Sequence, residues 1–165
     1  MFPGARIYKT IAAVAIALIL SKYVLGLSGF YMTVAVVLSM KTDPQKSYEY
    51  GKNRVLGTLL GGLLGYLIMM LVKHSPIHEE SILMVLINVG CAYLILWFAK
   101  LVHMPENGTT MGCVVFFSIT LIRFNQPVFD YVSIRVIETL IGVVIATIVN
   151  SIDFKKLIKW WALCL

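Results

Sequence analysis

Two arginines recur within a repeated motif and have the chemistry to bind carboxylates. Arg54 begins RVLGTLLGGLLG and Arg135 begins RVIETLIGVVIA, so both segments contain Arg-Val-x-x-Thr-Leu-x-Gly, at an offset of 81 residues. A guanidinium presents a planar fork of N–H donors that matches a carboxylate. An arginine beside an apolar segment can also extend its charged head toward lipid headgroups, and that interpretation stays open. Recurrence at one place in the repeat favours a shared role.

Three further cations extend this candidate anion site. They are Lys9, Lys52 and Arg123, each near the end of an apolar segment. If the chain crosses a membrane with a cytoplasmic N-terminus, a path for anions would have a mouth on each side. The cytoplasmic mouth would carry Arg54, Lys52 and Lys9, and the outer mouth would carry Arg135 and Arg123. Positive potential at both mouths concentrates anions before entry. The sequence therefore predicts these five side chains as substrate-binding residues.

The residue patterns of enzymes and metal sites are missing from the sequence. It contains no Gly-x-Ser-x-Gly, Walker or His-Glu-x-x-His motif. His74 and His78 have a helical metal-pair interval, but Pro76 lies between them and no third ligand is evident. We therefore expect no enzyme activity, no metal and no cofactor.

Composition places these residues in a membrane. Of the 165 residues, 59% are hydrophobic and 13% are charged, against about 45–50% and about 25% in soluble domains. The apolar residues form blocks long enough for membrane spans. The net charge of +6 does not indicate nucleic acid, because the basic residues lie at the ends of these blocks and form no continuous face. We expect an all-α integral membrane protein whose partner is the lipid bilayer.

Six apolar segments are candidate transmembrane helices. Their expected bounds are Ile7–Leu25, Gly29–Met40, Val55–Val72, Ser81–Ala99, Thr109–Ile122 and Ile134–Ile152. The second and fifth are short for a full crossing, and glycine or proline precedes each, which favours tilted, bent or partly re-entrant segments. We expect residues 1–152 to form the transmembrane domain. Residues 153–165, with three lysines and two tryptophans, would form a short interfacial tail.

The distribution of lysine and arginine orients the six helices. With a cytoplasmic N-terminus, ten of the 14 basic residues fall on the inner side and four on the outer side. The eight acidic residues divide evenly, and Glu138 is one of the four on the outer side. Basic residues are enriched on the cytoplasmic side of membrane proteins. We therefore expect both termini to be cytoplasmic.

The repeat suggests an inverted architecture. MTVAVVLSM from Met32 is similar to MGCVVFFSI from Met111, at an offset of 79 residues, so the second and third segments look related to the fifth and sixth. A unit of three crossings reverses direction when it recurs, so the second copy would lie upside down. Inverted repeats of this kind are typical of transporters.

Small residues follow each motif arginine at helical spacing. They are Gly57, Gly61 and Gly65 in one segment, and Gly142 and Ala146 in the other. Small residues four apart allow the backbones of membrane helices to approach closely. The same groove could form inside one subunit or at a dimer seam, and both interpretations stay open.

The stretch from Pro3 to Leu67 resembles a known family. GARIYKTIAA, then VAVVLSMKTD, then GKNRVLGTLLGGLLG occur in the order seen in the aromatic acid exporter family. That family belongs to the wider fusaric-acid-resistance-like group, to which plant aluminium-activated malate transporters are distantly similar. The resemblance implies a multi-pass inner-membrane protein that moves organic anions outward as a homodimer or larger homo-oligomer. Family members usually continue into a cytoplasmic helical domain or a second membrane half. Residues 153–165 resemble neither.

We therefore expect a permease that exports organic anions, in particular aromatic carboxylates. The alternative is an oligomeric membrane module that transports nothing itself and acts with a partner protein through the glycine stripe.

Overall fold

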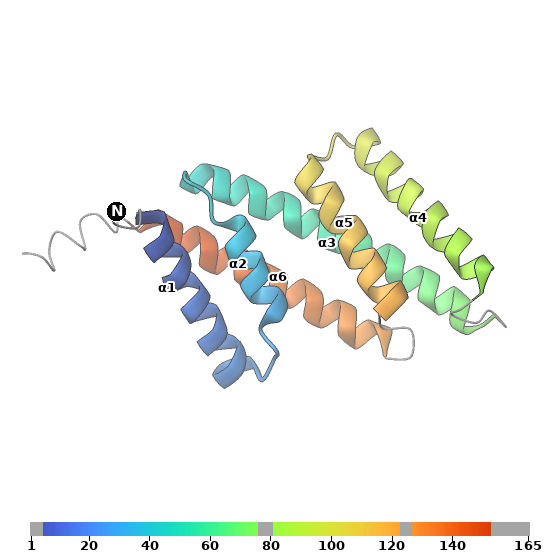
Figure 1. Cartoon of the computed structure of the whole chain (residues 1–165), viewed down its shortest axis with the longest axis horizontal. Coiled ribbons are helices and arrows are strands. Elements are labelled where there is room, and N and C mark those ends of the chain that lie inside the picture. Colours follow the sequence, from blue (N-terminus) through green and yellow to red (C-terminus); the bar gives the residue numbers. More distant parts are fainter. Residues whose placement is uncertain (1–4, 76–80, 123–126, 153–165) are drawn as a thin grey trace, which may run out of the picture. The chain divides into compact units, whose positions relative to one another are not determined.

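The computed structural model describes residues 5–75, 81–122 and 127–152, and within these ranges the chain is helical with no strand (Figure 1). The all-α prediction is confirmed for these residues. The elements are α1 (Ala5–Ile19), η1 (Leu20–Leu25), α2 (Phe30–Ser39), α3 (Pro44–Lys73), α4 (Ile82–Leu101), α5 (Glu106–Phe117), η2 (Ser118–Ile122) and α6 (Val128–Ser151), where η1 and η2 are π-helical.

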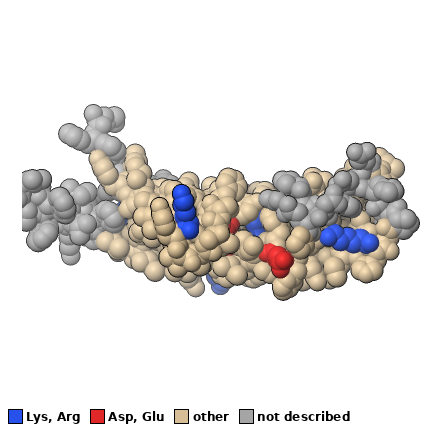
Figure 2. Space-filling view, turned by 90° about the horizontal axis from the view of Figure 1, so that it is seen from below, with Lys and Arg blue, Asp and Glu red and all other residues tan. Residues whose placement is uncertain are grey.

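Four of the described helical segments are long and apolar enough to cross a bilayer. They are Ile7–Leu25, Pro44–Lys73, Ile82–Leu101 and Val128–Ser151. Their outward side chains are mostly large and apolar, with Ile11 61%, Leu86 62% and Ile148 58% exposed. Figure 2 shows a face on which charged side chains are sparse among uncharged ones. Such a surface fits lipid rather than water, and the chain is a multi-pass membrane protein.

α2 is too short to cross a bilayer by itself. Its ten residues extend about 15 Å, whereas the hydrocarbon core is about 30 Å thick. Two glycines with positive φ delimit the turn before it: Gly26 at +63° ends η1, and Gly29 at +72° is the N-cap of α2. L-residues with side chains rarely adopt this conformation, so glycine permits the tight reversal from η1 into α2.

α3 begins much earlier than the sequence indicated. The expected start was Val55, but the helix begins at Pro44. Proline suits the first turn of a helix, and the Oδ1 of Asp43 accepts a hydrogen bond from the backbone N–H of Gln45 at 3.2 Å. The first turns carry polar residues such as Lys46 and Glu49, both exposed. Because this part is polar, hydropathy alone missed it. α6 likewise begins at Val128, not at Ile134.

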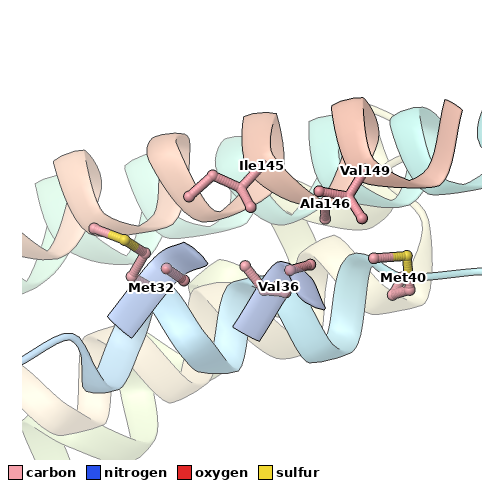
Figure 3. Close-up of a cluster of buried hydrophobic side chains, with 8 residues drawn as sticks. Met32, Val36, Met40, Ile145, Ala146 and Val149 are labelled. Atoms are coloured by element: carbon pink, nitrogen blue, oxygen red, sulfur yellow. The ribbon is translucent and has the colours of Figure 1, made fainter. Parts of the chain in front are cut away.

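The chain forms two compact units. Unit 1 comprises residues 1–51 and 138–165, and unit 2 comprises residues 52–137. α3 and α6 each contribute to both units. In unit 1, Met32, Val36 and Met40 of α2 pack against Ile145, Ala146 and Val149 of α6 (Figure 3). Ala13 and Ala17 of α1 complete this cluster, and both are fully buried.

Unit 2 has a core of its own, built from α3, α4, α5, η2 and the first turns of α6. Met69 of α3, Met84 of α4 and Ile119 of η2 belong to one buried cluster. Cys91 and Ile95 of α4 pack with Phe116 of α5 in another. These contacts hold the second short helix, α5, against two long ones.

Candidate functional site

Arg135 is a buried cation on α6, within unit 2. Only 6% of the residue is exposed, and its Nη2 donates a hydrogen bond of 3.1 Å to the Oγ of Ser118. Its guanidinium carbon lies 6.0 Å from the ring centroid of Tyr131, one turn earlier on the helix. An arginine inside a membrane domain is costly unless it is paired and hydrogen-bonded. The helix thus positions a donor-rich cation between a hydroxyl and an aromatic ring.

The partner of Arg135 lies at a change of helix type. Ser118 is the first residue of η2, and its Oγ also donates to the carbonyl oxygen of Val115 at 2.8 Å. Thr120 in the same π-helix is 2% exposed and donates to the carbonyl oxygen of Phe116 at 3.2 Å. π-Helical turns are rare and frequent at functional sites. Two buried hydroxyls therefore lie within one π-helical segment.

Arg54 occupies the equivalent position in the other copy of the motif. It lies on α3, also in unit 2, and is 3% exposed. The Oγ1 of Thr58 donates to the carbonyl oxygen of Arg54 at 2.9 Å, and Thr58 is 1% exposed. Its repeat counterpart Thr139 is 3% exposed. Both motif arginines are therefore buried, whereas a side chain extended toward lipid headgroups would be exposed.

The other predicted cations have different surroundings. Lys52 is exposed on α3. Lys9 lies on α1 in unit 1, and its Nζ donates a hydrogen bond of 2.8 Å to the carbonyl oxygen of Asn150. Arg123 lies outside the described residues. Arg54, Lys52 and Arg135 therefore belong to unit 2, and Lys9 belongs to unit 1. The hydrogen bond of Lys9 ties α1 to the last turn of α6.

Asn150 connects the end of α6 to the turn between α2 and α3. Its Nδ2 donates to the carbonyl oxygen of Lys41 at 2.9 Å and to the Oγ of Ser47 at 2.8 Å. The backbone N–H of Lys41 in turn donates to the Oγ of Ser47 at 2.9 Å, and the Nζ of Lys41 lies 3.7 Å from the ring centroid of Tyr50. The sequence carries no signal for this network, because a lone asparagine at the end of an apolar helix gives no indication of its partners.

The glycines of α3 pack against α5. A Cβ added to Gly57 would lie 2.0 Å from the carbonyl oxygen of Gly108, and one added to Gly61 would lie 2.0 Å from that of Gly112. One added to Gly65 would lie 2.9 Å from the Cδ1 of Ile119. A Cβ at position 57 or 61 would overlap the backbone of α5, so a side chain there requires the two helices to separate. A Cβ at position 65 would press on the side chain of Ile119 instead. The glycine stripe of α3 therefore packs against α5 and η2 of the same chain.

The repeat-related residues of α6 pack against α2 in the same way. A Cβ on Gly142, the counterpart of Gly61, would lie 2.6 Å from the carbonyl oxygen of Met32. Ala146, the counterpart of Gly65, is fully buried in the α2–α6 cluster. Each long helix of one repeat thus packs on the short helix of the other.

One position breaks this correspondence. The counterpart of Gly57 is Glu138, and the counterpart of Gly108 is Gly29. Where unit 2 has a close glycine–glycine contact, unit 1 has a hydrogen bond from the backbone N–H of Gly29 to the Oε1 of Glu138, 3.1 Å long. Glu138 is fully buried. In the expected topology Glu138 counts among the outer acids, although it is the sole acidic residue inside the repeated motif.

Comparison with known proteins identifies a family. The family model described as "Fusaric acid resistance protein-like" matches residues 11–149. None of the curated proteins and none of the solved structures matches the chain significantly. Within the part of the chain that the structure describes, no three His, Cys, Asp or Glu side chains gather as a metal-binding group would.

Proposed function

Because this chain belongs to the fusaric acid resistance protein-like family, whose match spans residues 11–149, we propose that it is a permease for organic anions. Its substrates are aromatic carboxylates, which it exports across the inner membrane. That the chain is a multi-pass membrane protein of a transport family rests on the family match and on the four segments long enough to span a bilayer. The substrate class rests on the arginines.

The burial of Arg54 and Arg135 carries this proposal. Both lie on long apolar helices, both are at least 94% buried, and both occupy the same position in a repeat. Placing arginine inside a membrane domain costs about 2.5–3.5 kcal/mol on insertion scales. A fold that bears this cost at two repeat-related positions has donors suited to a carboxylate. Tyr131 beside Arg135 adds a ring surface against which an aromatic substrate can pack.

The remaining cations serve the approach of the anion rather than its binding. Lys52 is exposed two residues before Arg54, where its charge attracts anions through water. Arg123 is proposed for the same role at the opposite mouth. Lys9 contributes positive potential while its Nζ holds the carbonyl oxygen of Asn150.

The proposed topology has six crossings with both termini in the cytoplasm. The exchange of short helices between the repeats supports two related halves, and an odd number of helices per half implies opposite orientations. The short helices α2 and α5 complete their crossings with the help of neighbouring segments. A homo-oligomer is part of the proposal, and since α5 fills the glycine stripe, association uses other faces.

A flux assay tests this function. The purified chain is reconstituted into vesicles of phosphatidylethanolamine and phosphatidylglycerol loaded with radiolabelled para-hydroxybenzoate, and efflux is compared with that from protein-free vesicles. We expect efflux above the protein-free rate, saturation with substrate and inhibition by other aromatic carboxylates. Folded protein that adds nothing to the protein-free rate contradicts the proposal.

A further inference from the structure

Glu138 differs from every other acidic residue that the structure describes. Glu49, Glu106 and Asp130 are exposed and Asp43 is half-buried, whereas Glu138 is 0% exposed. It lies within α6, one of the spanning segments. An ionisable residue inside a membrane segment is expensive, and such residues commonly mark ion or proton pathways. Glu138 therefore calls for a role beyond packing.

The position of Glu138 gives its ionised form a specific support. Its Oε1 accepts the N–H of Gly29, the N-cap of α2, at 3.1 Å. The N-terminus of a helix carries partial positive charge and donors without helical partners, both of which stabilise a carboxylate. Only glycine fits here, since a Cβ at position 29 would lie 2.6 Å from the Oγ of Ser21 in η1. The acid is thus bound at the start of a short helix.

Packing alone does not require an acid at this place. In unit 2 the corresponding helices approach through Gly57 and Gly108, with a glycine where α6 has Glu138. The same helix pairing therefore forms with no side chain at this position of the motif. The carboxyl group is an addition that one repeat carries and the other lacks, which indicates that its charge is used.

The other ionisable groups around Glu138 define its electrostatic setting. α2 contributes only Tyr31, and on α6 Arg135 precedes Glu138 by three residues. The cations of unit 1 whose side chains the structure describes are Lys9, Lys22, Lys41 and Lys46, from α1, η1, the α2–α3 turn and α3. Lys9 and Lys41 have contacts elsewhere, and Lys22 and Lys46 are exposed. The tyrosines Tyr8, Tyr23, Tyr48 and Tyr50 and the acids Asp43 and Glu49 complete the set.

We propose that Glu138 takes up a proton when the protein binds an organic anion and releases it when the anion leaves. This inference rests on the proposed function. A second negative charge in a membrane domain is unfavourable, so the arrival of one carboxylate raises the proton affinity of the other. Linkage makes the effect reciprocal: protonation of Glu138 strengthens anion binding.

The proton balance of this step is simple. A proton from water forms an O–H bond on the carboxylate of Glu138 as the anion enters, and that bond breaks and returns the proton to water as the anion departs. The net charge of the protein with its ligand is then the same before and after binding. Neutralisation of Glu138 also removes the charged acceptor from the N–H of Gly29, which loosens the start of α2.

Calorimetry of anion binding counts this proton. The full chain in lipid nanodiscs is titrated with para-hydroxybenzoate near neutral pH in phosphate and in Tris, two buffers with different ionisation enthalpies. The difference in binding heat gives the number of protons taken up. We expect about one proton for each anion bound by the wild-type protein. Binding with the same heat per anion in both buffers, after dilution is subtracted, overturns the proposal.

Two variants assign the proton to Glu138. Glu138→Gln keeps an oxygen acceptor for Gly29 but cannot ionise, so it should bind the anion without proton uptake. Glu106→Gln removes an exposed acid at the start of α5 and should keep the wild-type proton count. If Glu138→Gln fails to fold, Glu138→Asp retains a carboxyl group and should retain the uptake. Proton uptake that persists in Glu138→Gln contradicts the assignment. Failure of folded wild-type protein to bind any anion contradicts the proposed function instead.

Discussion

The guanidinium of Arg135 on α6 donates a hydrogen bond of 3.1 Å to the Oγ of Ser118, the first residue of the π-helix η2. These two residues are 17 positions apart in the chain, and both are more than 90% buried. Because Ser118 also donates to the carbonyl oxygen of Val115, its lone pairs point toward the arginine. This contact fixes the orientation of the cation that we assign to the substrate carboxylate.

Replacement of Ser118 by alanine should weaken anion binding without abolishing it. The variant retains the charge of Arg135 but loses the acceptor that orients it, and a hydrogen bond to a charged group contributes about 1.5–3 kcal/mol. We expect the apparent KM for para-hydroxybenzoate efflux to rise about tenfold, with a smaller change in maximal flux. Ser75→Ala removes an exposed hydroxyl that only donates to the carbonyl oxygen of Leu71 and should leave the KM unchanged. Equal effects of the two changes would contradict the role of Ser118.

Substitutions of Arg54 and Lys52 should affect flux with different salt dependence, although the two residues are only two positions apart. Arg54→Gln removes a buried cation from the binding site, so flux should fall about 10- to 100-fold at any salt concentration. Lys52→Gln removes an exposed charge that acts through solvent, so its effect should be several-fold at low salt and disappear at about 1 M salt, where the Debye length is about 3 Å. Salt titrations of the efflux rate of both variants measure this. A salt-sensitive Arg54→Gln defect would place that arginine on the approach path.

Gly61→Ala should destabilise the fold of the single chain. The new methyl group would lie 2.0 Å from the carbonyl oxygen of Gly112, so α3 and α5 must separate, at a cost of about 1–3 kcal/mol. Gly90 on α4 has nothing within 4 Å of an added Cβ, and Gly90→Ala should be neutral or stabilising by up to about 1 kcal/mol. Thermal unfolding in detergent compares the two. A Gly61→Ala protein that melts like wild type but loses self-association would indicate that the stripe lies at a dimer seam.

Asn150→Ala should destabilise the end of α6. It removes the side chain that donates to the carbonyl oxygen of Lys41 and to the Oγ of Ser47, leaving polar groups of the α2–α3 turn without this donor, which costs about 1–3 kcal/mol. Ser151→Ala serves as the matched control, because Ser151 is exposed and donates only to the carbonyl oxygen of Thr147. Limited proteolysis at the α2–α3 turn and the melting temperature should both respond to Asn150→Ala and not to Ser151→Ala.

Hydropathy was sufficient to predict the helices, but not where each begins. The apolar runs from Ile82 and from Val55 correspond to α4 and to the apolar part of α3. Hydropathy does not detect the polar start of α3, because its first turns carry polar residues; the signal is the pair Asp43 and Pro44, which begins the helix. Periodicity detects the buried part of a helix, and the part that extends toward water needs the capping residues.

Contacts between distant segments were only partly predictable. The repeat indicated that Gly61 and Gly142 share a role, but it did not say that their neighbours are Gly112 on α5 and Met32 on α2. Small residues show that a helix can pack closely against another, but they do not identify which helix that is. The spacing of Gly108 and Gly112, four residues apart, was the available signal for α5.

Glu138 shows the limit of charge counting. Its assignment to the outer side used only its place in the sequence. Its position as the sole acid inside the repeated motif marks it as unusual, but does not show that it is fully buried beside Gly29. The same limit applies to Lys9, whose Nζ binds the carbonyl oxygen of a residue 141 positions away.

Efflux of para-hydroxybenzoate from vesicles that contain wild-type, Arg135→Ala or Lys73→Ala protein tests the central claim most directly. Lys73 is an exposed cation at the end of α3 and controls for a general loss of positive charge. We expect saturable efflux for the wild-type and Lys73→Ala proteins, and at least about a tenfold loss for Arg135→Ala with folding intact. Efflux by Arg135→Ala at the wild-type rate and KM would contradict it.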